Sequence, residues 1–105
     1  MSDFVNVVSS TNKACILNGL NIVTGGTGIA DATIGLPSPG FRCTIRIGSI
    51  TNGSVVVTCV NGTFDGTNNT ATFDAANESI TLVYNTATAW AIESNVGGVG
   101  LSSVT

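Results

Sequence analysis

Short apolar runs, many of them β-branched, alternate with turns rich in Gly, Asn and Pro along the whole chain. The clearest run covers 41–47, where apolar Phe41, Cys43, Ile45 and Ile47 are separated by polar Arg42, Thr44 and Arg46. This period of two predicts a β-strand with one face buried and the other in contact with water.

The same reasoning places further strands on both sides of this one. The candidate runs are 4–8, 14–17, 20–23, 32–36, 55–60, 71–73, 79–84, 89–93 and 99–101. Asn18-Gly19 is typical of a tight hairpin turn, so we expect it to join 14–17 to 20–23. The nearly unbroken apolar run 55–60 predicts a strand covered on both faces, and 63–70 reads as an exposed loop.

Helix signals are nearly absent, and the chain of 105 residues has the length of one domain. We therefore expect a single all-β domain over 1–105, an antiparallel β-sandwich or barrel of about eight short strands. A jelly-roll-like or β-tulip-like knob would satisfy this pattern. Residues 1–10 would form an N-terminal strand or arm.

Charged residues are scarce, with three Lys and Arg against six Asp and Glu and a formal net charge of −3. A nucleic-acid interface needs several cations on one face, and an anionic membrane surface attracts the same groups. The composition therefore predicts no nucleic-acid partner and no membrane partner. Ser, Thr, Asn and Gly must form most of the polar surface.

The three cysteines, Cys15, Cys43 and Cys59, each lie within an apolar run. Free cysteine is among the most buried residue types, so we expect three reduced thiols in the core, with one disulfide plus a free thiol as the alternative. The N-terminus has neither a basic region nor a long apolar stretch. This predicts no signal peptide and synthesis in a reducing cytoplasm.

The chemistry of ordinary enzymes has few candidates here. The chain has no His, which removes the commonest general base and zinc ligand. The Gly-rich segment 24–28 lacks the ending of a phosphate-binding loop, and 65–69 lacks the bidentate acid of a calcium loop. Paired carboxylates would have to come from Asp65, Asp74, Glu78 and Glu93. We expect no catalytic residue, no metal and no cofactor.

Two pairs of side chains remain as binding candidates. Arg42 and Arg46 lie on the polar face of one strand, either solvated or paired with acids of a partner chain. Trp90 and Tyr84 either form a platform on which a sugar ring stacks or, more simply, belong to the core.

Three stretches together resemble a group of small phage structural proteins, the capsid decoration (cement) proteins and related head or tail-fibre domains. They are 32–47, with its Thr-Ile-Gly-Leu-Pro-Ser-Pro-Gly turn before a strand, 79–84, with its Ser-Ile-Thr-Leu-Val-Tyr strand, and 89–94, with its Ala-Trp-Ala-Ile strand. The similarity covers about residues 30–102.

The resemblance implies a β-knob, commonly a homotrimer, on the outer capsid surface of the virion, where it binds the major capsid protein and stabilises the head. It places the contact with the capsid or a neighbouring subunit on the N-terminal strand, at Phe4, Val5, Val7 and Val8, with Arg42 and Arg46 as further candidates. Two alternatives stay open: a fibre or tail module that binds host-surface glycan, and a carbohydrate-binding module of a secreted protein.

Overall fold

The structure is a computed structural model in which residues 5–24, 31–50 and 53–103 are described, and these residues form nine strands and no helix. The strands are β1 (Val5–Val8), β2 (Gly19–Thr24), β3 (Asp31–Ile34), β4 (Arg42–Ser49), β5 (Val55–Cys59), β6 (Thr70–Phe73), β7 (Ser79–Thr86), β8 (Ala89–Val96) and β9 (Gly100–Ser102). The all-β prediction is confirmed.

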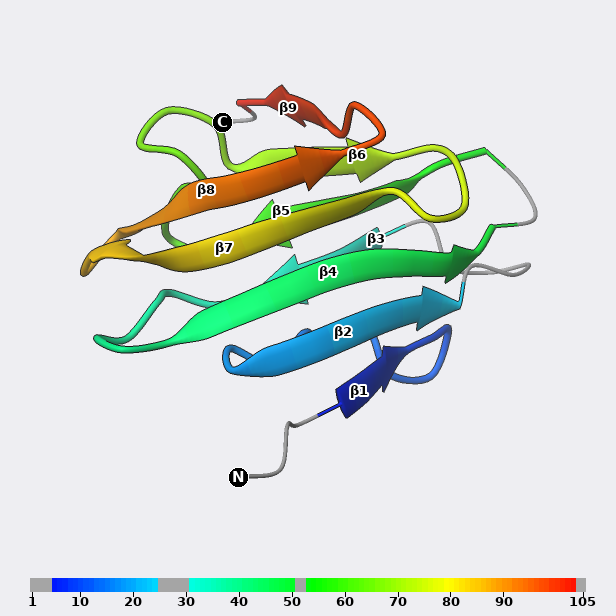
Figure 1. Ribbon diagram of the computed structural model, residues 1–105, viewed down its shortest axis with the longest axis horizontal. Helices are drawn as coiled ribbons and strands as arrows, with labels where there is room; N and C mark the ends of the chain where they lie inside the picture. The colour runs from blue at the N-terminus through cyan, green and yellow to red at the C-terminus, as the bar shows by residue number, and fades with distance from the viewer. Residues whose placement is uncertain (1–4, 25–30, 51–52, 104–105) are drawn as a thin grey trace.

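The strands form two sheets that lie one in front of the other (Figure 1). The five-stranded sheet has the order β1-β2-β4-β7-β8, and the four-stranded sheet has the order β3-β5-β6-β9. Buried side chains from both sheets form one continuous core between them. Strand β9, close to the predicted run 99–101, lies at the edge of the four-stranded sheet.

The first half of the chain winds between the two layers. Strands β1, β2 and β4 pair in parallel in one sheet, and β3 pairs in parallel with β5 in the other. Parallel neighbours require the chain to return to the same end before each new strand, and here it returns through the opposite layer. The result is a flattened coil.

The second half is antiparallel. Strands β7 and β8 form a hairpin that pairs with β4, while β6 lies between β5 and β9. Strand β4 is therefore the junction, with a parallel neighbour on one side and an antiparallel neighbour on the other. The expectation of antiparallel pairing describes this half, whereas the sheets as a whole are mixed.

The predicted hairpin at Asn18-Gly19 is wrong. Residues before it pass along the other layer, where Ala14 bridges to Thr33 in parallel and the Cys15 N–H donates to the Thr33 carbonyl at 2.8 Å. Gly19, with a φ of 125°, turns the chain from that layer into β2. A two-residue turn would return the chain beside itself in one sheet, but here it makes a corner between sheets.

Alternation in the sequence predicts the buried face well. Cys43, Ile45 and Ile47 of β4 face the core, as the period of two requires. The run 55–60 is not covered on both faces: every second residue of β5 is buried, and Val60 is 44% exposed. The predicted loop 63–70 contributes a core residue, since Phe64 is fully buried.

Candidate interaction surface

An apolar surface lies on the outward side of the first two strands. Val5 and Val7 are 59% and 50% exposed, and they stand beside Leu20 and Ile22 of β2, which are half-buried. These four side chains point away from the core because their neighbours in sequence point into it. We call them the apolar outer face.

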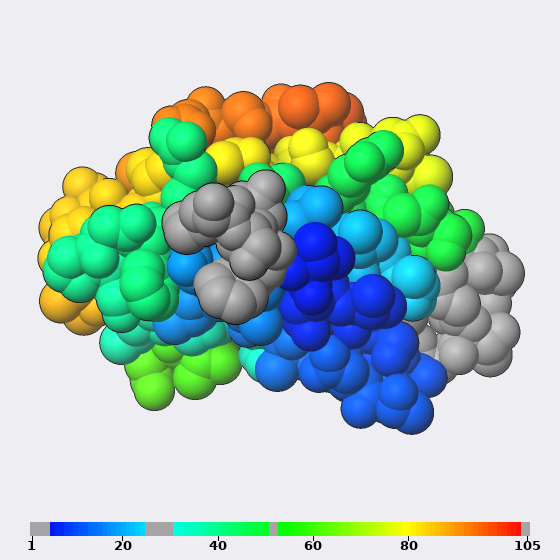
Figure 2. Space-filling model, turned by 60° about the horizontal axis from the view of Figure 1, so that its bottom comes forward, coloured from blue at the N-terminus to red at the C-terminus, as the bar shows by residue number. Residues whose placement is uncertain are grey.

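The structure leaves Val5 and Val7 as candidate contact residues on the N-terminal strand and removes Val8. Val8 is completely buried, because its position on the inward side of β1 places it in the core beside Val23. Val8 is therefore not available as a contact residue. Phe4 lies outside the described residues. Strand β1 itself is at the surface, as the dark-blue atoms in Figure 2 show.

Beside the apolar outer face the same sheet becomes polar. An open hollow of about 380 Å³ is lined by Val5, Leu20, Arg42 and Thr44 among others. Arg42 forms an exposed ion pair with Glu93 within the same chain, and the Arg46 guanidinium donates to the Asn77 Oδ1 at 3.3 Å. Both arginines have partners within the chain, so a partner's acid would have to displace these.

Among the residues that the structure describes, one edge of β1 has no neighbouring strand. The Thr24 hydroxyl of β2 donates to the Val8 carbonyl at 3.2 Å, so that carbonyl faces β2. Successive carbonyls of a strand point to opposite sides, and the Val7 carbonyl consequently faces the free edge. It accepts a hydrogen bond from the Asn12 side-chain amide at 2.8 Å. Asn12 is thus the residue that covers part of this edge.

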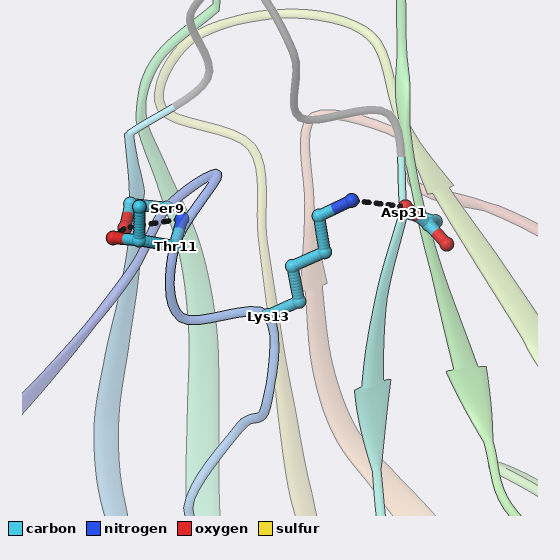
Figure 3. A network of polar contacts seen from close by, with 4 residues as sticks. All are labelled: Ser9, Thr11, Lys13 and Asp31. Atoms are coloured by element: carbon cyan, nitrogen blue, oxygen red, sulfur yellow. Dashed lines mark hydrogen bonds and ion pairs between the residues drawn. The ribbon is translucent and has the colours of Figure 1, made fainter.

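A tight turn holds Asn12 in place. Ser9 and Asn12 exchange backbone hydrogen bonds of 2.8 and 3.1 Å, and the Ser9 and Thr11 hydroxyls lie 3.2 Å apart. Immediately after the turn, the Lys13 ammonium reaches across to Asp31 at the start of β3, at 3.2 Å (Figure 3). The ion pair ties the segment after the turn to the four-stranded sheet.

The cysteines are free thiols, as predicted. Cys43 and Cys59 are buried, and Cys15 is partly buried. Burial raises the pKa of Cys15 and of Cys43 to about 12, because an apolar surrounding disfavours the thiolate. Since the thiolate is the reactive form, these groups act as small apolar core residues.

The Asp65 carboxylate accepts hydrogen bonds from residues that follow it closely in sequence. Burial would raise the pKa of Asp65, but hydrogen bonds from Asn68 and from the Thr67 backbone outweigh it and lower the pKa. The Oδ1 atom accepts from the Thr67 and Asn68 N–H groups at 3.0 and 2.7 Å, and Oδ2 accepts from the Asn68 amide. This is an Asx turn. The carboxylate already has partners, as the ordinary-turn interpretation requires.

Glu93 and Glu78 have structural partners too. Glu93 pairs with Arg42, and the Glu78 Oε1 accepts from the Asp74 and Ala75 backbone N–H groups at 2.7 and 3.1 Å. Within the ranges that the structure describes, no group of three His, Cys, Asp or Glu residues is arranged to hold a metal ion. The Gly-rich segment 25–28 lies outside these ranges.

Trp90 is a core residue. Its side chain is fully buried, and its Nε1 donates to the Gly35 carbonyl at 3.0 Å. Tyr84 is half-buried. The core interpretation of Trp90 is confirmed, and a sugar-stacking platform built on it is wrong because the indole has no exposed face.

In the described part of the chain, every buried side-chain nitrogen and oxygen has a hydrogen-bond partner. No helix there is long and apolar enough to span a bilayer. Comparisons of the chain with protein-family models, with curated proteins and with solved structures gave no match.

Sequence reasoning missed the two asparagines that organise this region. Asn21 is fully buried and Asn12 covers the edge of β1, but both read as ordinary polar residues next to turns. Alternation could not find Asn21, because Leu20-Asn21-Ile22 assigns the two apolar residues to the buried face and Asn21 to the polar one.

Proposed function

We propose that this protein is a structural subunit of a phage particle, a decoration protein that binds the outer surface of the head and stabilises it. Its partner would be the major capsid protein, and it would be made in the host cytoplasm. The observation that carries the proposal is the apolar outer face, displayed on a sheet whose backbone is fixed by β2 and β4.

Exposed apolar groups that lie together on one rigid surface favour a contact with another protein. The polar Thr44 and Arg46 adjoin the apolar outer face in the register of β2 and β4, as a rim adjoins an interface core. The resemblance of 32–47, 79–84 and 89–94 to decoration proteins supports the capsid as the partner. A binding role without catalysis agrees with carboxylates that serve turns and ion pairs.

The alternative of a fibre module that binds glycan has no specific observation in its favour, because Trp90 is buried. Copy number would distinguish the two roles. A decoration protein is present in hundreds of copies per virion, whereas a fibre module is present in a handful.

The proposal is tested by mixing the protein with empty heads that lack it and sedimenting them. We expect saturable binding to the heads. The double variant V5T/V7T keeps the side-chain shapes and adds two hydroxyls to the apolar outer face, so its affinity should fall at least about tenfold.

Val60 provides the matched control, since it is 44% exposed but lies outside the apolar outer face, and V60T should bind like the parent protein. Equal loss in V60T and V5T/V7T would contradict the assignment of the surface. Failure of the parent protein to bind any empty head would contradict the decoration role itself.

A further inference from the structure

The free edge of β1 presents backbone groups that a neighbouring strand would pair. Because the N–H and C=O of one residue point to the same side of a strand, Val5 and Val7 present theirs to the free edge, as the Asn12 contact to the Val7 carbonyl shows. Asn6 and Val8 direct theirs to β2. The edge therefore offers two donors and two acceptors, one acceptor already occupied by Asn12.

The short length of β1 and the Asn12 contact protect this edge in part, but its sequence does not oppose pairing. Strand β1 has the sequence Val-Asn-Val-Val, without a charge, a proline or a glycine. The Ser9–Asn12 turn limits it at the carboxyl end.

From this geometry we infer that β1 pairs with β1 of a second copy of the chain, antiparallel and about a two-fold axis at Asn6. In this register, Val5 of each copy lies opposite Val7 of the other. Both residues direct their backbone groups to the free edge, so each pair exchanges two hydrogen bonds. The two-fold axis at Asn6 relates the Val5–Val7 pair on one side of it to the identical pair on the other side.

The distribution of charge favours a second copy as the occupant. Two copies of a chain with net charge −3 repel each other unless their contact avoids charged groups. Neither β1 nor β2 carries a charge, and Lys13, the nearest charged residue after β1, is paired with Asp31. Within the described ranges, the two-fold contact thus places no like charges opposite each other.

Pairing would also unite the two apolar outer faces. Val5 and Val7 of both copies point to the same side of the joined sheet, next to Leu20 and Ile22. One continuous apolar surface then extends across the two-fold axis. The inference goes beyond the decoration role and does not depend on it, because the pairing belongs to the chain alone.

Asn12 controls access to the edge. Its side-chain amide occupies the Val7 carbonyl, the acceptor that the Val5 N–H of the second copy needs. The Asn12 side chain occupies the space through which that N–H approaches the oxygen, so Asn12 weakens the pairing and moves aside when it forms. Removing the Asn12 amide should strengthen association, and removing the Val7 N–H should weaken it.

The test is the mass of the purified full chain in solution, measured by sedimentation equilibrium over a range of concentrations. The parent protein should show a reversible equilibrium between one and two copies. The N12A variant should dimerise at least about fivefold more tightly. The V7P variant should dimerise at least about tenfold more weakly, because proline has no N–H and is tolerated where that group faces away from the sheet.

The matched control is V7A, which shortens the side chain but keeps the N–H. It should dimerise more tightly than V7P, and far-UV circular dichroism should show the fold of all variants. Three outcomes would overturn the inference: a parent protein with one copy at all concentrations, a three-copy species, or N12A and V7P that change the affinity in the same direction. A three-copy species requires a head-to-tail contact, which two identical β1 strands cannot provide.

Discussion

At the scale of single residues, close packing at one end of the core decides what the sequence tolerates. A Cβ on Gly62 would lie 2.4 Å from the Leu36 Cδ2 and 2.7 Å from the Thr88 carbonyl oxygen. Trp90 is fixed in the same region by its hydrogen bond to Gly35 and by a 2.9 Å bond from its N–H to the Thr63 carbonyl. Glycine at 62 is therefore required by space.

The buried thiols make stability depend on alkaline pH. In the folded chain the pKa of Cys43 is about 12, against 9.0 for a free thiol, so the unfolded chain ionises first. The contribution of this thiol to the free energy of unfolding is constant below pH 9 and falls above it until the folded thiol also ionises near pH 12. For this one group the slope is about 1.4 kcal/mol per pH unit. Urea unfolding at a series of pH values measures it.

Cys43→Ala is the control for that measurement. The variant should be less stable at neutral pH, because it leaves a small cavity, but its stability should fall less steeply above pH 9. An unchanged slope in the variant would show that the alkaline loss comes from other groups.

At the scale of strands, the sequence predicts positions better than partners. Alternation located β4 and β7, because burial of one face imposes a period of two on any strand. It could not reveal that β2 pairs in parallel with β4, since that pairing depends on a chain that returns through the other layer. The hairpin predicted at Asn18-Gly19 is wrong because the conformational freedom of this dipeptide suits a corner between sheets as well as a hairpin turn.

The candidate site was predictable to the same extent. Exposed Val5 and Val7 follow from an apolar strand at the start of the chain, and the inward direction of Val8 does not, because only the pairing with β2 fixes the inner face. The edge contact of Asn12 depends on a turn that brings it back to Val7. No local pattern encodes such a return.

Asn21 fixes the corner that the hairpin interpretation missed. Its Oδ1 accepts from the Ile16 N–H at 2.8 Å and its Nδ2 donates to the Ile16 carbonyl at 3.0 Å. Asn21→Ala leaves both backbone groups without this partner in a buried place, so we expect a loss of about 3 kcal/mol in the free energy of unfolding. Urea denaturation with Trp90 fluorescence gives the value.

Asn95 is a matched control because it makes the same two bonds to Val99, at 2.8 and 3.1 Å, but is exposed. Asn21 also accepts a hydrogen bond from the Asn6 amide at 3.1 Å and fills a fully buried position, so Asn95→Ala should reduce stability less, by about 1 kcal/mol. Similar losses in the two variants would mean that burial of Asn21 contributes nothing.

At the scale of the whole molecule, apolar packing between the two sheets and backbone hydrogen bonds within each sheet stabilise the fold. Ion pairs contribute little to the free energy of unfolding. The described residues contain two ion pairs, Lys13–Asp31 and Arg42–Glu93, and all four side chains are substantially exposed. Exposed pairs contribute little to stability and are screened by salt.

Stability should accordingly be almost independent of ionic strength. Between about 0.05 M and about 0.5 M NaCl, we expect the free energy of unfolding to change by less than about 1 kcal/mol. Urea denaturation at both salt concentrations measures the change. A drop of several kcal/mol in the higher salt would show that charge pairing holds the sheets together.

The position of β4 between a parallel and an antiparallel neighbour has a consequence for synthesis on the ribosome. When the coil of β1 to β5 has left the exit tunnel, β4 still has one side without a partner, and so does β5. The open side of β5 is paired only after β6 has been translated, and the open side of β4 only after β7. The nascent chain therefore carries two strands with an unpaired edge until β6 and β7 emerge, and the two sheets can be completed only after that.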